Sequence, residues 1–131
     1  MKISQIQADF QNKVELYLLV GIHAYQDING DIIKKIPAIV IKNVGNSVIY
    51  LEKYVFNGRE YPKGRSIIPP TSSVNDACYT IELPTDGTPH VSLQISFQDW
   101  QGQKWDVTGY ADLKEGFWEL TYSPCVKIDK T

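Results

Sequence analysis

The sequence predicts an all-β domain, an antiparallel sandwich of two sheets with about seven or eight strands. Three observations support this prediction. Apolar and polar side chains alternate with a period of two, Gly, Asn and Asp interrupt the alternation at short intervals, and helical periodicity is nearly absent. Because no helix-length segment separates the strands, folds built from strand–helix–strand units are excluded.

The length of the chain limits the number of domains. Its 131 residues can close one apolar core but not two, so residues 1–131 are expected to form a single domain. Between Ile3 and Val14, apolar residues recur at spacings of three and four. This spacing predicts either a short helix packed on the sandwich or a flexible leader over residues 1–14.

The first two strands are expected to pair. Large side chains alternate from Leu16 to Tyr25, which is typical of a long strand. The dipeptide Asn29-Gly30 readily adopts positive φ in a tight hairpin, and the alternation resumes over Ile36–Asn43.

The middle of the chain contains one strand followed by a less regular section. Val48–Phe56 alternates, and the dipeptide Asn57-Gly58 turns the chain into a short stretch, Arg59–Tyr61. Prolines and a glycine follow over residues 62–70 and argue against a central strand, so loop and sheet edge are expected there.

The second half of the chain contains four more predicted strands. They are Ala77–Leu83, Val91–Phe97, Lys104–Leu113 and Phe117–Tyr122, separated by turns at Asp86-Gly87, Asp99–Gly102 and Glu115-Gly116. The tail over residues 124–131 is expected to fray.

The stretch Ile36–Gly58 contains the corner Asn43-Val44-Gly45, and the run Ile67–Pro70 and the hairpin Phe97-x-Asp99-x-x-Gly102 follow it. With these short motifs, the corner above all, the chain from Ile36 to about Leu113 resembles bacterial immunoglobulin-like sandwich domains of uncharacterised function. The chain departs from antibody domains because it lacks paired core cysteines with a Trp between them. The resemblance implies a module of a larger or membrane-tethered protein and assigns no reaction to it.

Charge and hydropathy argue against two classes of partner. The formal net charge is -2 and the basic residues are scattered, so no basic stripe is available to follow nucleic acid. The longest apolar run, Leu16–Ile22, is too short to cross a bilayer. A polar N-terminus without a secretory signal predicts a cytoplasmic location for the chain as given, and membrane tethering or export only if a segment precedes Met1.

Cysteines and candidate metal ligands are few. Cys78 and Cys125 are expected to be free thiols, with a bridge between them as the alternative. The pattern Asp27-x-Asn29-x-Asp31 begins like a calcium loop, but the glycine and glutamate that such a loop requires later are not in place. A hairpin turn is therefore favoured there, and neither a metal nor a cofactor is predicted.

No motif of the common enzyme classes occurs. The sequence contains no glycine-rich phosphate loop, no GxSxG and no HExxH, and its two histidines, His23 and His90, fall in or beside different strands. We therefore predict no catalytic residue.

The aromatic residues near the C-terminus provide the candidate binding residues. Trp100 stands at the tip of a predicted turn between Asp99 and Gln101, so it is expected to reach solvent. Trp105 and Trp118 are the other candidates, although packing in the core is the alternative for them.

Three functions remain open from the sequence. The leading hypothesis is a non-catalytic protein-interaction or accessory module. The first alternative is a carbohydrate-binding module that stacks sugar rings on these tryptophans, with Asp99 and Gln101 as hydrogen-bond partners. The second is a structural subunit of a virion or cell-surface assembly.

Overall fold

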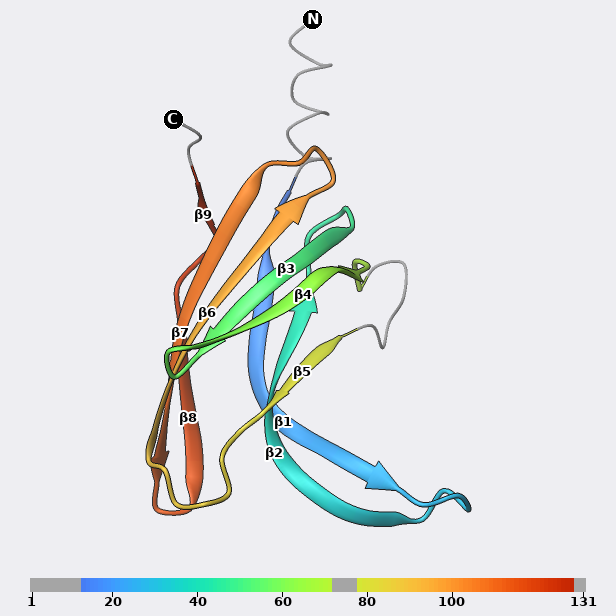
Figure 1. Ribbon diagram of the computed structural model, residues 1–131, viewed down its shortest axis with the longest axis vertical. Coiled ribbons are helices and arrows are strands. Elements are labelled where there is room, and N and C mark those ends of the chain that lie inside the picture. The colour runs from blue at the N-terminus through green and yellow to red at the C-terminus, as the bar shows by residue number, and fades with distance from the viewer. Residues whose placement is uncertain (1–12, 72–77, 129–131) are drawn as a thin grey trace, which may run out of the picture.

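The computed structural model describes residues 13–71 and 78–128. Within these ranges the chain forms nine strands and no helix, so no described segment could span a membrane as a helix. The strands make two antiparallel sheets, which confirms the predicted all-β sandwich (Figure 1). The helix or leader predicted for residues 1–14 lies almost entirely outside the described residues.

The strand boundaries are as follows: β1 Leu16–Gln26, β2 Ile32–Asn43, β3 Ile49–Phe56, β4 Arg59–Ile68, β5 Tyr79–Glu82, β6 His90–Asp99, β7 Lys104–Lys114, β8 Phe117–Tyr122 and β9 Val126–Lys127. The small sheet has the order β1-β2-β5, and the large sheet has the order β4-β3-β6-β7-β8, with β9 also paired to β7.

The core lies between the two sheets. On β6, Val91, Leu93, Ile95 and Phe97 are at most 2% exposed, and they face Ile39 and similar residues of the small sheet. Burial of each such side chain contributes about 1.5–3 kcal/mol. The period-two pattern of β6 therefore identifies the inner face correctly.

A buried asparagine fixes the corner between β2 and β3. Asn43 is 0% exposed, and its amide nitrogen donates to the carbonyl oxygens of Ser47 at 2.8 Å and Ile68 at 3.0 Å. Its side-chain oxygen accepts a hydrogen bond from the backbone N–H of Gly45 at 3.0 Å. This side chain thus ties the end of β2 to the end of β4.

Strand β4 is longer than the sequence predicts. The expected edge position is confirmed, but the expected loop is wrong, because pairing with β3 continues to Ile68. An edge strand tolerates Pro62, since its missing N–H costs a hydrogen bond only where a neighbouring strand needs one. The register shifts between Leu51 and Lys53, opposite this proline.

The C-terminal segment also differs from the prediction of a fraying tail. Val126 and Lys127 pair with β7 as strand β9. Beyond them, the Ile128 N–H donates to the Lys104 carbonyl at 2.9 Å, and the Gln103 side chain donates to the Ile128 carbonyl at 2.8 Å. Residues 129–131 lie outside the described part of the chain.

The β1–β2 hairpin extends beyond the sandwich. Strand β2 begins at Ile32, four residues before the predicted start, because it pairs with β1 as far as Gln26. The third strand of this sheet, β5, reaches only Ala38–Ile41 of β2. We call residues 22–35 the arm; Figure 1 shows it bending away from the large sheet.

Candidate functional site

The predicted binding residues do not form one exposed platform. Trp100 is 50% exposed at the turn between β6 and β7. Trp105 and Trp118 are half-buried and pack against the core from β7 and β8. Gln101 is exposed beside Trp100, whereas Asp99 is only 7% exposed.

Asp99 stabilises the turn on which Trp100 stands. One carboxylate oxygen accepts hydrogen bonds from the backbone N–H groups of Gln101 and Gln103, at 2.9 and 3.0 Å. The other oxygen accepts a hydrogen bond from the Trp105 indole N–H at 3.1 Å. The carboxylate is thus occupied within the protein and holds Trp105 in place.

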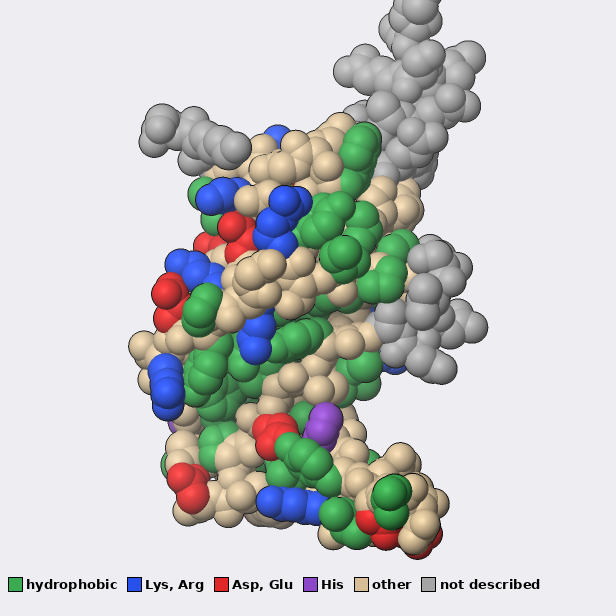
Figure 2. Space-filling model, turned by 45° about the vertical axis from the view of Figure 1, so that its right-hand side comes forward, with side chains coloured by type: hydrophobic (Ala, Val, Ile, Leu, Met, Phe, Trp, Pro, Cys, Tyr) green, Lys and Arg blue, Asp and Glu red, His purple; other side chains and the backbone are tan. Residues whose placement is uncertain are grey.

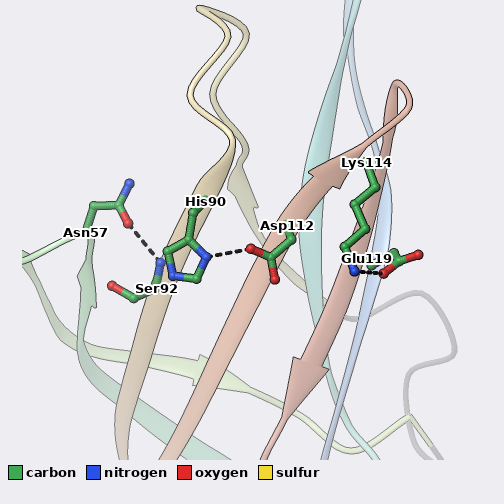
Figure 3. Close-up of polar contacts among 6 residues, drawn as sticks. All are labelled: Asn57, His90, Ser92, Asp112, Lys114 and Glu119. Atoms are coloured by element: carbon green, nitrogen blue, oxygen red, sulfur yellow. Dashed lines mark hydrogen bonds and ion pairs between the residues drawn. The ribbon is translucent and has the colours of Figure 1, made fainter.

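The outer face of the large sheet carries a row of polar contacts (Figure 3). His90 and Asp112 lie directly opposite each other on β6 and β7, and His90 Nδ1 is 2.6 Å from the Asp112 carboxylate. Farther along this face, the Lys114 ammonium lies 3.1 Å from Glu119. Exposed pairs of this kind contribute little to stability because water and salt screen them.

The same face places a serine near the His–Asp pair, but the three do not form a catalytic relay. The Asn57 side-chain oxygen accepts a hydrogen bond from the Ser92 backbone N–H at 2.8 Å. Figure 3 shows the Ser92 hydroxyl pointing away from the His90 ring. The His90 and Asp112 side chains are 55% and 46% exposed, so this pair lies on an open surface.

A hollow of about 440 Å³ lies farther along this sheet. Its lining includes Lys53, Gln94 and Asp106. One Asp106 oxygen accepts a hydrogen bond from the Gln94 amide at 3.0 Å, while the other oxygen is buried without a hydrogen-bond partner. Asp106 therefore contributes to the wall of the hollow mainly through the oxygen that is bonded to Gln94.

The arm exposes apolar side chains. Ile28 at its tip is 101% exposed, and Ile33, Ile22 and Ile32 are 67%, 64% and 52% exposed. In Figure 2 the arm projects from the body of the molecule, with hydrophobic side chains near its end. Alternation along β1 does not reveal this surface, because it assigns residues to strand faces without showing which positions the second sheet covers.

A polar cluster joins the base of the arm to β5. The Tyr25 hydroxyl donates a hydrogen bond to Glu82, and His23 Nδ1 lies 3.3 Å from the Thr80 hydroxyl. The bond to Glu82 raises the pKa of Tyr25 above its ordinary value, because it favours the protonated phenol. These contacts link the base of the arm to the third strand of the small sheet.

The tip of the arm is an ordered turn. Asp27 Oδ1 accepts hydrogen bonds from the backbone N–H groups of Asn29 and Asp31, at 2.9 and 3.0 Å, and Gly30 adopts a φ of 84°. The predicted hairpin turn is confirmed. Within residues 13–71 and 78–128, no group of three or more His, Cys, Asp or Glu side chains is placed to hold a metal ion.

Neither cysteine takes part in a disulfide bond. Cys78 is exposed just before β5, and Cys125 is half-buried between β8 and β9. Burial raises the pKa of the Cys125 thiol, because it disfavours the thiolate. The two thiols therefore differ in accessibility.

Comparisons with protein families, with curated proteins and with solved structures gave no match to this chain.

Proposed function

We propose that this chain is a non-catalytic protein-interaction module, in which an immunoglobulin-like sandwich presents the β1–β2 arm to another protein. The observation that supports this most directly is the exposure of the four isoleucines of the arm. Burial of an isoleucine side chain stabilises a protein by about 1.5–3 kcal/mol, and this chain leaves all four of them largely exposed. Apolar residues gathered on a projecting element favour a surface that docks a partner over a surface that stays in contact with water.

The strand order supports the immunoglobulin-like assignment. In such domains, strands A, B and E lie in one sheet and strands C, F and G in the other. Here β1, β2 and β5 occupy the first set of places in chain order, and β3, β6 and β7 occupy the second. Strand β4 adds to the edge beside β3, and β8 adds to the edge beside β7. The kinship with bacterial modules is part of the same proposal.

Site-specific photo-crosslinking tests the proposed function. A photoreactive residue replaces Ile28 in cells that produce the chain, and a matched control carries it at Phe117, which is 77% exposed on β8. We expect a discrete adduct from position 28 and none from position 117. No adduct from position 28, or the same adducts from both positions, would refute docking through the arm.

Carbohydrate binding remains the second candidate because Trp100 is half exposed at the tip of its turn. A single accessible ring can stack on one sugar. If Trp100 binds a sugar, oligosaccharides should change the tryptophan fluorescence, and Trp100→Ala should abolish that change with little effect on the melting temperature. An unchanged spectrum across a broad glycan panel would eliminate this candidate.

A further inference from the structure

The edges of the two sheets are protected unequally. Edge strand β4 contains Pro62 and four charged residues, β5 has only four residues, and β8 has six residues with Glu119 among them. Strand β1 has 11 residues and contains no Pro, Asp, Glu, Lys or Arg. Proline, charge and short length are among the devices that stop an edge from pairing with another chain. Strand β1 has none of these three, and its one irregularity, between Tyr25 and Gln26, lies at the end of the strand.

Beyond Leu16, whose backbone bonds to the Cys125 thiol, strand β1 has hydrogen-bonding groups to offer along this edge. Among the described residues, β2 is the only strand paired with β1. In an antiparallel sheet, alternate residues of an edge strand direct their N–H and C=O groups away from the neighbouring strand. Another strand could therefore extend the small sheet at β1.

We propose that a second copy of this chain pairs with β1 through its own β1, antiparallel and across a two-fold axis. The two small sheets then form one continuous sheet. This inference rests on the proposed function and names the partner: another molecule of the same chain.

In this arrangement, side chains on β1 of one copy lie opposite side chains of the same character on β1 of the other. Full overlap of the strand Leu16–Gln26 places the two-fold axis at Gly21, its middle residue. Val20 then lies opposite Ile22 of the second copy, and these side chains are 36% and 64% exposed in the single chain. On the other face, Tyr17 lies opposite Tyr25, an aromatic pair of the kind that stabilises neighbouring strands.

The same overlap brings a projection of one copy to a hollow in the other. It places the tip of the arm, where Ile28 is 101% exposed, level with Val14 of the second copy. Val14, Leu16, Tyr122 and Cys125 help to line a hollow of about 570 Å³ there. Because one chain carries both the projection and the hollow, a two-fold axis makes this contact twice. This repetition favours a second copy over an unrelated strand.

Analytical ultracentrifugation of the full chain tests the inference. From about 1 μM to about 300 μM, a range that covers dissociation constants in the micromolar decades, the mass should rise from 14.9 kDa toward twice that value. Ile22→Lys places a charge on the edge and should weaken the dimer at least about tenfold. Phe117→Lys, the matched control on β8, should leave the dimer unchanged.

A mixed crosslink tests the register. When the Val20→Cys and Ile22→Cys chains are mixed and oxidised, a disulfide between positions 20 and 22 should form, because directly opposite Cα atoms lie about 4.5–5.5 Å apart, a separation that a disulfide can span. Peptide mass spectrometry distinguishes this bond from any that involves Cys78 or Cys125. A dimer that lacks the 20–22 bond would overturn the proposed pairing.

The two proposals fail in different ways. A wild-type chain that stays monomeric throughout, or an Ile22→Lys variant that dimerises as well as the wild type, would overturn pairing through β1. If position 28 still forms an adduct with a different protein in cells, the interaction module stands and only its partner is wrong. If position 28 forms no adduct and the chain stays monomeric, both proposals fail.

Discussion

Replacement of Asp99 distinguishes a structural role from a binding role for this residue. Asp99→Ala removes the acceptor of three hydrogen bonds, two from backbone N–H groups and one from the Trp105 indole. At about 1–1.5 kcal/mol per bond, the free energy of unfolding should fall by about 3–4.5 kcal/mol. This loss is a large part of the roughly 5–15 kcal/mol that stabilises a typical domain.

Urea unfolding monitored by tryptophan fluorescence measures this loss, and two milder variants apportion it. Asp99→Asn keeps one acceptor oxygen for the turn but can direct an amide group toward the indole N–H, so it should cost about 1–2 kcal/mol. Trp105→Phe removes the indole donor and should cost a similar amount or more, since packing is also lost. If Asp99→Ala lowers stability by less than about 1 kcal/mol, the assignment of Asp99 to the turn is wrong.

Three further predictions follow from the packing and the ionisable groups. Gly45→Ala should destabilise the fold by about 1–3 kcal/mol in thermal unfolding, because the new methyl would lie 2.4 Å from a backbone oxygen; a neutral outcome would contradict this close approach. With a thiol reagent near neutral pH, Cys78 should react at once and Cys125 slowly, because burial raises the pKa of Cys125; equal rates would refute the difference. Glu82→Gln should lower the pKa of Tyr25, measured by tyrosinate absorbance, whereas an unchanged pKa would exclude the contact. Since folding raises the pKa of Tyr25, its stabilising contribution should be present below the ordinary tyrosine pKa and be lost as the pH rises through the folded value.

The accuracy of the sequence-based fold prediction follows from what each strand faces. Strand β6 lies inside the large sheet, with one face on the core and the other in solvent, so its side chains alternate and its boundaries are predicted well. Strand β4 lies at an edge, where Pro62 is compatible with pairing. A rule that treats proline as a strand breaker therefore shortens β4. The short strand β9 pairs with β7, and the Gln103 side chain donates to the Ile128 carbonyl just beyond it; no local pattern reveals these contacts.

The candidate binding residues show a different limit. Turn position places Trp100 at the surface, and the structure leaves it half exposed. The same reasoning groups Asp99 with Trp100, yet the Asp99 side chain turns inward to accept hydrogen bonds from its own turn. Aspartate at the start of a turn commonly bonds to the backbone two residues later. That local preference was the available signal that Asp99 belongs to the turn.

Strand β1 shows why the arm could not be found from periodicity. Leu16, Leu18, Val20 and Ile22 share one face, and the alternation marks all four equally. In the structure the first two are 5% and 3% exposed, whereas Val20 and Ile22 are 36% and 64% exposed. Periodicity shows which side chains share a face, but only the length of the opposing sheet decides where that face is covered. Strand β1 continues past that cover, so a pattern typical of a core strand becomes, over its second half, an apolar surface available to a partner.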